Sequence, residues 1–292
     1  MTNFRNASTL LLGTFALLAA AGAASAQAKG EPDLFAFSEG ARLVEYPDDV
    51  MISQMDSSPL NLIDGFVATD WTGQASPAPA FVLELPERTE LSRISFDTSP
   101  LNRDAKAVKS VTVEVSDTSS TSGFETVAAV TLKRLKNNQS FSFDPEFLPV
   151  GRWVRLTVVD NYAGDEYSAL TGFHGYGKQL TSVAKMPNVT GTYEGHSGWG
   201  EIHLTQQGNE VTGCYAYLNG RVTGVIKGRT MILTMIETGL DGSPIKHRAY
   251  FGMSANGKEL IGIGRNTDPA LGEGYFDFYA ADRTGNRAGS CG

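Results

Sequence analysis

The sequence predicts an all-β fold, and three observations lead to this expectation. Apolar and polar residues alternate over many short runs, whereas no long stretch repeats its apolar residues with the helical period. Segments rich in Ser, Asn, Pro and Gly separate these runs at short intervals. Glycine is abundant, with 32 residues in 292, and only 19% of the residues are charged. This pattern is typical of antiparallel sheets joined by tight turns.

Residues 1–26 have the pattern of a secretory signal peptide. Arg5 precedes an apolar run shorter than the ~20 residues that a membrane-spanning helix needs. Residues 24–26, Ala-Ser-Ala, form a cleavage site before Gln27. The alternative is an uncleaved membrane anchor. No cysteine stands near the cleavage site, as a lipoprotein would need, and no later apolar stretch is long enough to span a bilayer. We therefore expect a periplasmic or secreted protein.

The charge of the chain argues against two classes of partner. The net charge is −8, and removal of residues 1–26, which carry Arg5 and no acid, changes it to −9 because one positive charge is lost. An acidic protein repels phosphate backbones and anionic lipids. Nucleic acids and anionic membranes are therefore not expected as partners.

Residues 27–177 are expected to form a β-sandwich. The alternating runs there are short and turn-rich segments separate them, as in sandwich folds. They lie at 81–85, 92–96, 111–116, 140–143 and 153–159. The polar segment 178–187, which ends in a proline, is interpreted as a linker.

Residues 188–292 are expected to form a smaller antiparallel domain. Eight strand-like runs with glycine-containing turns between them lie at 189–194, 201–205, 210–217, 221–226, 230–237, 247–253, 259–264 and 274–279. An up-and-down β-barrel fits such a sequence without leaving bare edges. An open, curled antiparallel sheet fits it equally.

The two cysteines, Cys214 and Cys291, both lie in this domain. Export favours a disulfide between them, which contributes about 4 kcal/mol in the chain-entropy view. The alternative is two free thiols. The four histidines, His174, His196, His203 and His247, are scattered and do not have the spacing of a metal site.

Several segments of the first domain, taken in order, resemble one known family. They are 61–71 with its Asp-Gly and Thr-Asp-Trp, 81–85, 111–116, Gly123-Phe124, 153–158 and 170–177. Together they resemble the discoidin-like domains, also called coagulation factor 5/8 type C domains. These share the galactose-binding-like jelly-roll sandwich with the family 32 carbohydrate-binding modules. The resemblance implies non-catalytic recognition by loops, most often of sugars.

The resemblance also implies a calcium site in the early loop. Asp64, the carbonyl of Phe66 and Thr69 match the family's oxygen ligands. The family's glutamate in the closing strand is replaced here by Gly172, so calcium affinity should be lower. The alternative is a turn in which Asp64 and Thr69 bond the local backbone.

A sugar site is expected at the loop end of the sandwich. Arg103 lies near the place of the family's sugar-binding arginine, and the loop 160–167 supplies Asn161, Tyr162 and Tyr167. Aromatic faces with a few polar groups are what sugar sites use. The alternative is an ordinary solvated loop. Trp71 is expected in the core.

No catalytic constellation is evident, so an enzyme is not predicted. Glycoside hydrolysis needs two facing carboxyls. Asp165 and Glu166 are adjacent, so on a strand they would point to opposite faces. The chain also lacks the Gly-x-Ser-x-Gly motif of serine hydrolases.

The second domain is faintly similar to avidin-like and lipocalin-like barrels. The similarity is a rhythm of Gly-x-Tyr and Val-Thr-Gly-x-Tyr near the hairpins. Four aromatic residues, Tyr193, Trp199, Tyr215 and Tyr217, either line a pocket or pack in the core.

These expectations lead to one function and one alternative. The chain is predicted to be an exported binding protein that recognises carbohydrate of the cell wall or of an extracellular polysaccharide. The alternative is a structural or assembly protein of the cell envelope that binds a protein partner.

Overall fold

The computed structural model describes residues 31–47, 57–99, 106–164, 166–182, 186–196, 199–266 and 276–290. The predicted signal peptide, Arg103 and Cys291 lie outside these residues. From Pro32 onward the chain forms one compact unit. Its regular structure is almost entirely β, which confirms the predicted fold class. Within the described ranges, no helix has the length and hydropathy needed to cross a membrane.

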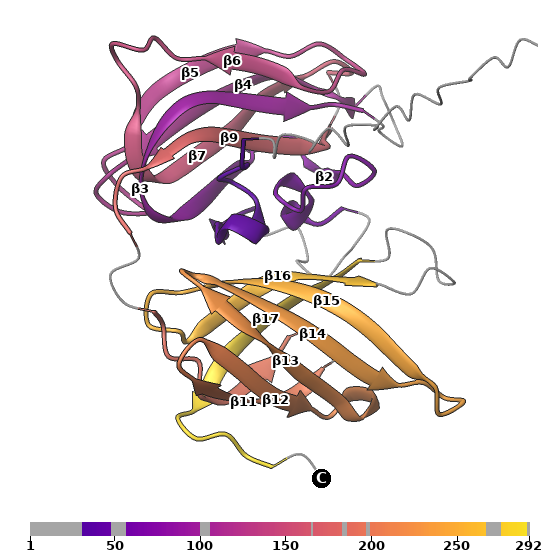
Figure 1. Ribbon diagram of the computed structural model, residues 1–292. Coiled ribbons are helices and arrows are strands. Elements are labelled where there is room, and N and C mark those ends of the chain that lie inside the picture. Colours follow the sequence, from indigo (N-terminus) through magenta and orange to yellow (C-terminus); the bar gives the residue numbers. More distant parts are fainter. Residues whose placement is uncertain are drawn as a thin grey trace, which may run out of the picture. The chain divides into compact units, whose positions relative to one another are not determined.

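The first domain is a β-sandwich with short 3-10 helices near its start (Figure 1). Its elements are η1 (Phe37–Glu39), β1 (Arg42–Glu45), η2 (Pro59–Leu62), β2 (Trp71–Gln74), β3 (Ala80–Asp97), β4 (Val108–Ser116), β5 (Glu125–Thr131), β6 (Gln139–Ser142), β7 (Val150–Asn161), β8 (Tyr167–Leu170) and β9 (Gly172–Gln179). The larger sheet has the order β1-β3-β7-β4-β5, with β6 and β9 also paired to β3. Strands β2 and β8 form a separate pair.

Strand β3 takes part in two sets of pairings. Residues 80–84 pair with β7, and residues 82–84 pair with β1 as well. Residues 89–97 pair with β9, with β6 over 93–96 and with β7 again at 89–90. The register with β7 shifts between Glu84 and Thr89. Pro86 lies in this break and has no amide proton to donate to a ladder. Two predicted runs, at 81–85 and 92–96, thus belong to one strand.

Aromatic side chains fill the sandwich core. Phe96 and Phe173 stack with their ring centroids 5.0 Å apart, and Trp71 meets Phe81 edge-on at 4.8 Å. All four side chains are fully buried. The expectation that Trp71 is a core residue is confirmed.

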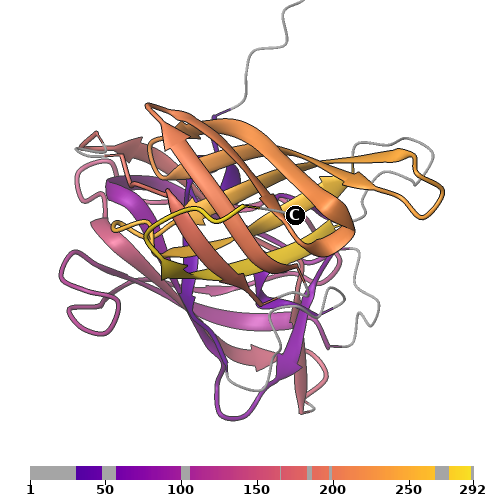
Figure 2. The same cartoon turned by 90° about the horizontal axis from the view of Figure 1, so that it is seen from below.

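The second domain is a closed barrel of eight antiparallel strands (Figure 2). Its strands are β10 (Gly191–Gly195), β11 (Gly200–Gln207), β12 (Glu210–Tyr215), β13 (Gly220–Lys227), β14 (Thr230–Thr238), β15 (Pro244–Met253), β16 (Glu259–Asn266) and β17 (Phe276–Gly285), with η4 (Tyr217–Asn219) before β13. Consecutive strands pair, and β17 pairs back to β10. The barrel alternative is confirmed over the curled open sheet.

The barrel interior is filled by side chains. Alternate residues of the strands point inward, as in Met231, Leu233 and Met235 of β14, and all three are buried. At one place Trp199 stacks on Tyr215 with a centroid distance of 4.9 Å. A barrel of eight strands is just wide enough for such filling.

Candidate functional site

The loop between β7 and β8 lies against two other segments of the sandwich. The backbone amide of Tyr162 donates to the carbonyl of Ala107 at 3.0 Å, and the Tyr162 hydroxyl donates to the carbonyl of Leu132 at 2.6 Å. One tyrosine thus connects the β7–β8 loop, the start of β4 and the turn after β5. We call this group of loops the loop end of the sandwich.

Two half-exposed tyrosines stand at the loop end. Tyr162 is 38% exposed and Tyr167 is 36% exposed. The Arg134 guanidinium carbon lies 5.6 Å from the ring centroid of Tyr162, and the Lys106 ammonium nitrogen lies 4.1 Å from that of Tyr167. Each ring is therefore accompanied by a cation within the range of a cation–π contact.

Asn161 serves the loop itself. Its side chain is buried, and its amide nitrogen donates to the Tyr167 carbonyl at 3.1 Å and to the Ser168 hydroxyl at 3.2 Å. Its side-chain oxygen accepts from the Gly164 amide at 2.6 Å. These bonds hold the loop in shape between its two tyrosines. Contact between Asn161 and a ligand stays a prediction, as does the role of Arg103, which lies outside the described residues.

Sequence reasoning missed Lys106 and Arg134. Lys106 lies just before β4 and Arg134 lies in the turn after β5, so neither is near the two tyrosines in sequence. That turn is fixed by Gln139, whose side chain accepts from the Lys133 amide at 2.6 Å and donates to the Lys136 carbonyl at 2.8 Å. No local sequence signal could have shown that these cations meet the tyrosines.

The loop predicted to hold calcium is closed by its own hydrogen bonds. The Thr69 hydroxyl donates to Asp64 Oδ2 at 2.7 Å and lies 3.2 Å from the Phe66 carbonyl, while the Phe66 amide donates to Asp64 Oδ1 at 2.7 Å. The predicted ligands thus bond one another, as the turn alternative expects. They offer four oxygens, two of them from one carboxylate, whereas calcium takes six to eight. These three residues by themselves do not complete a calcium site, and calcium binding here stays a prediction.

The contacts of Asp64 do not offset the cost of burying its charge. Burial raises the pKa of its carboxyl from 3.8 to about 7, although the hydrogen bonds from Thr69 and Phe66 act in the opposite direction. A calcium ligand is needed in its charged form. Calcium binding would therefore compete with protonation of Asp64.

His174, on β9, stands between two further aspartates. Its Nδ1 lies 2.7 Å from Asp33 Oδ2, and its Nε2 lies 3.1 Å from Asp97 Oδ2. Burial lowers the pKa of the imidazole, but the two carboxylates outweigh it and raise the pKa from 6.5 to about 9. No local sequence pattern indicates this arrangement, because the partners lie 141 and 77 residues away from His174.

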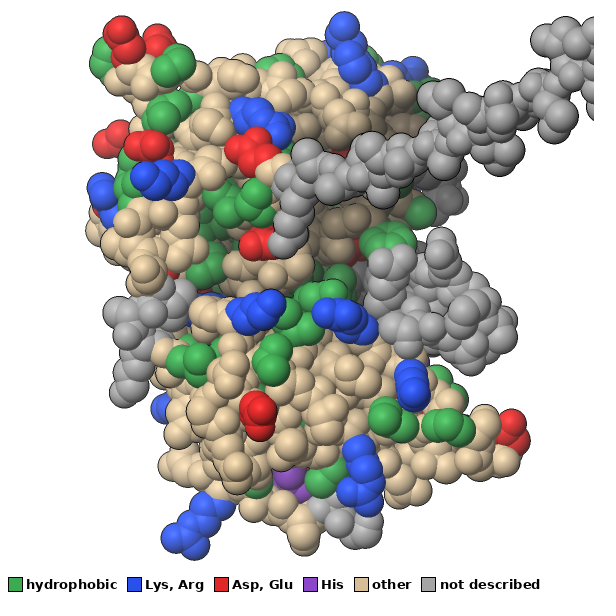
Figure 3. Space-filling model, in the orientation of Figure 1, with side chains coloured by type: hydrophobic (Ala, Val, Ile, Leu, Met, Phe, Trp, Pro, Cys, Tyr) green, Lys and Arg blue, Asp and Glu red, His purple; other side chains and the backbone are tan. Residues whose placement is uncertain are grey.

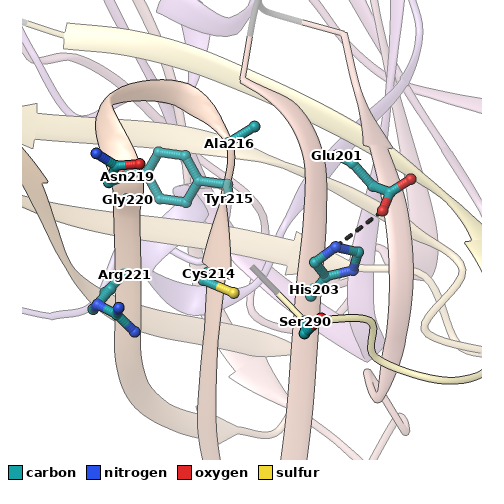
Figure 4. Close-up of a pocket in the computed structure, with 9 residues that line it drawn as sticks. All are labelled: Glu201, His203, Cys214, Tyr215, Ala216, Asn219, Gly220, Arg221 and Ser290. Atoms are coloured by element: carbon teal, nitrogen blue, oxygen red, sulfur yellow. Dashed lines mark ion pairs between the residues drawn. The ribbon is translucent and has the colours of Figure 1, made fainter. Parts of the chain in front are cut away.

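A cavity of 190 Å³ lies on the barrel (Figure 4). His203, Cys214 and Arg221 are cross-strand neighbours on β11, β12 and β13, and Ser290 of the C-terminal segment completes the wall. Residues next to this trio along the strands point into the barrel core, so the trio faces outward. Cys214 is disulfide-bonded. Its pairing with Cys291 stays a prediction because Cys291 lies outside the described residues.

A threonine, a histidine and a glutamate beside this cavity have the order of a catalytic triad. His203 Nδ1 lies 3.1 Å from Thr192 Oγ1, and His203 Nε2 lies 2.9 Å from Glu201 Oε1. The Thr192 hydroxyl, however, donates to the Arg287 carbonyl at 2.8 Å, and the Gly289 amide donates to His203 Nδ1. His203 Nδ1 is therefore occupied by a backbone donor, and Thr192 and His203 anchor the C-terminal segment.

Most of the aromatic residues that were predicted either to line a barrel pocket or to pack are buried in the barrel core. Tyr193 and Trp199 are buried in the barrel core, whereas Tyr217 is half-exposed. Tyr215 is buried as well, although it forms part of the wall of the outer cavity, and its hydroxyl donates to Glu237 Oε1 at 2.7 Å. The packing alternative is confirmed for Tyr193 and Trp199.

Comparisons with known proteins bear on the sandwich. Residues 64–179 match the family model of the Sad1/UNC-like C-terminal domain. The predicted resemblance to a discoidin-like domain is confirmed. No curated protein matches the chain.

Solved structures similar to this chain include three carbohydrate-related modules. The family 32 module of Clostridium perfringens NanJ, in complex with galactose, has 15% identity and a TM-score of 0.38, and the match covers 49% of this chain and 98% of that one. A putative chitobiase fragment from Bacteroides thetaiotaomicron has 18% identity and a TM-score of 0.43, with 53% and 98% covered. The family 32 module of Streptococcus pneumoniae EndoD has 13% identity and a TM-score of 0.36, with 50% and 100% covered. At such values no residue role or ligand transfers from them to this chain.

Proposed function

We propose that this chain is an exported, non-catalytic binding protein whose sandwich binds carbohydrate through its loop end. The observation that carries the proposal is the pair of half-exposed tyrosines, Tyr162 and Tyr167, each accompanied by a cation. Sugar rings pack their C–H faces on aromatic planes, while nearby donors bond the hydroxyls. Lys106 and Arg134 supply such donors.

The rigidity of the loop end supports binding. The Tyr162 hydroxyl is bonded to the Leu132 carbonyl, and Asn161 holds the loop that carries both tyrosines. A ring fixed before the ligand arrives loses little conformational freedom on binding. The loop end therefore has the pre-organisation that a weak, face-stacking ligand requires.

The surface charge is compatible with a neutral ligand. Figure 3 shows that, on the face in view, acidic and basic side chains are interspersed with small groups of hydrophobic ones. Export, through the predicted signal peptide at residues 1–26, would bring the protein to cell-wall or extracellular polysaccharides. Cell-wall polysaccharide and extracellular polysaccharide are both candidate ligands within the proposal.

The test is sugar binding by the mature chain and its tyrosine variants. Binding is screened on a glycan array, and affinity for the best saccharide is then measured by calorimetry. Tyr162→Ala and Tyr167→Ala should each weaken binding by about tenfold, since a stacked ring contributes about 1.4 kcal/mol. Tyr162→Phe, which keeps the ring, should weaken it less.

Phe147→Ala is the matched control. Phe147 is 76% exposed and precedes β7, so it lies at the other end of that strand, roughly 35 Å from Tyr162. Its removal should leave sugar affinity unchanged. No binding to any saccharide at millimolar concentration would refute the proposal. The alternative, an assembly protein with an envelope partner, would then be the better reading.

A further inference from the structure

One corner of the sandwich gathers three aspartates from distant segments around a histidine. Asp33 precedes η1, Asp64 lies in the loop before β2, and Asp97 ends β3. His174 of β9 bonds Asp33 and Asp97 directly and also interacts electrostatically with Asp64. We call these four residues the acidic corner.

Each of the six carboxylate oxygens of the acidic corner has a donor from the protein. Asp33 Oδ1 accepts from the amides of Phe35 and Gly175, and Asp97 Oδ1 accepts from the amide of Asn138 at 2.6 Å. The imidazole bonds Oδ2 of both residues. Both oxygens of Asp64 are bonded within its own loop, as described above. Every carboxylate oxygen of the corner is thus already bonded within the protein.

The imidazole also fills the space beside Gly172. A Cβ atom on Gly172 would lie 2.7 Å from His174 Nε2, which is closer than real contacts allow. A side chain at position 172 and the present position of His174 therefore exclude each other. The present position of the His174 ring therefore requires a glycine at position 172.

The acidic corner needs a positive charge, and the histidine supplies it. The side chains of His174, Asp33 and Asp97 are 15%, 19% and 5% exposed, so water screens their charges only partly. One buried and one partly buried carboxylate, Asp97 and Asp33, would be unfavourable side by side without a counterion. We propose that the imidazolium of His174 is the resident cation of this corner, and that the sandwich needs no bound metal ion there.

The electrostatics of the group agree with this assignment. Hydrogen bonds to Asp33 and Asp97 raise the pKa of His174 to about 9, so the ring is charged at neutral pH. Asp97, in turn, has its pKa lowered, since the effects of His174 and Asn138 outweigh burial. The single imidazolium thus offsets one of the two carboxylate charges, and backbone amides bond the other oxygens of Asp33 and Asp97.

The resident cation also fixes the start of the domain. Asp33 is held by His174 and by the Gly175 amide, and the Leu34 amide donates to the Gly175 carbonyl at 2.8 Å. These contacts bind residues 33–34 to β9. Loss of the imidazolium should therefore loosen both the corner and the first residues of the sandwich.

The experiment compares calcium with histidine substitution in the full mature chain, first treated with EDTA. Thermal unfolding is followed with EDTA and with about 5 mM CaCl₂. This concentration exceeds the dissociation constants of weak extracellular calcium sites, which reach about 1 mM. The Tm of the wild type should differ by less than about 1 °C between EDTA and CaCl₂. The Tm of His174→Gln should be about 5–10 °C below that of the wild type in both conditions. A clear calcium-induced rise in wild type, or an unchanged Tm for His174→Gln, would overturn the proposal.

Two further measurements remain decisive if His174→Gln does not fold. NMR of the ring nitrogens should show His174 as an imidazolium at pH 8 in the wild type. Asp33→Asn removes one of its two carboxylate partners, so His174 should lose its proton at a lower pH in that variant. A neutral ring at pH 8 would refute the proposal. The double variant Gly172→Glu with His174→Ala exchanges the cation for a carboxylate, so its Tm should rise with CaCl₂. The absence of such a rise would refute the idea that the imidazole takes the place of a metal.

Discussion

His174 shows how one residue can set the behaviour of a whole corner. It faces Asp33 and Asp97 directly and interacts electrostatically with Asp64. Tyr176, which carries Arg93 over its ring, interacts with the same two aspartates, Asp33 and Asp97. A histidine whose folded pKa exceeds its unfolded pKa stabilises the fold most in the acidic range. The contribution of this residue must therefore depend on pH in a defined window.

We expect the free energy of unfolding to fall as the pH rises from about 6.5 to 9. The His174 contribution is complete below the unfolded pKa of 6.5 and is lost as pH passes the folded value of about 9. The loss should reach at most about 3 kcal/mol. Urea unfolding at several pH values measures it, and His174→Gln should flatten the curve in this range. A wild-type curve as flat as that of the variant would contradict the expectation.

At the scale of elements, the barrel depends on close contacts between strands and rings. Tyr215 ends β12 and lies against Gly220, the first residue of β13, while Trp199 stacks on its ring. A Cβ atom added to Gly220 would overlap the ring of Tyr215, because three ring carbons would lie much closer to it than real contacts allow. The hairpin between β12 and β13 is therefore built around a glycine.

Gly220→Ala should destabilise the barrel by roughly 1–3 kcal/mol, because the ring of Tyr215 must move within a packed core. Gly285→Ala is the matched control, since its Cβ would meet no atom closer than 3.5 Å. Denaturant unfolding followed by tryptophan fluorescence measures both. Equal stability of the two variants would show that the tyrosine ring has room to adjust.

The strands themselves were largely predictable from the sequence, whereas their partners were not. Alternation marks a strand because its side chains point to opposite faces, and all eight barrel runs became strands. Closure of the barrel depends on β17 meeting β10, a pairing that local pattern does not encode. The same limit applies to the site. Tyr162 and Tyr167 are neighbours in sequence and were found, but Lys106, Arg134 and the partners of His174 come from distant segments.

At the scale of the whole molecule, the C-terminal segment is tied back onto the barrel. The Gly289 amide bonds His203, and the Arg287 carbonyl accepts from Thr192, so the segment runs along β10 and β11. Cys214 on β12 is disulfide-bonded beside it. A bond to Cys291 would complete this attachment.

Reduction of the disulfide should lower the stability of the oxidised protein by about 4 kcal/mol, because the closed loop spans most of the barrel. Thermal unfolding with and without dithiothreitol measures the change. Cys214→Ser should unfold at the temperature of the reduced wild type and should not respond to dithiothreitol. Peptide mapping without reduction should recover Cys214 linked to Cys291, and any other linkage would contradict the assignment.

The double pairing of β3 has a consequence for how the sandwich comes apart. Its eighteen residues bond β1 and β7 at one end and β9 and β6 at the other. None of these pairings can open fully without disturbing the strand on which the others depend. We therefore expect the strands bonded to β3 to unfold as one cooperative unit, so that the tyrosines of the loop end and the histidine of the acidic corner share a single unfolding event.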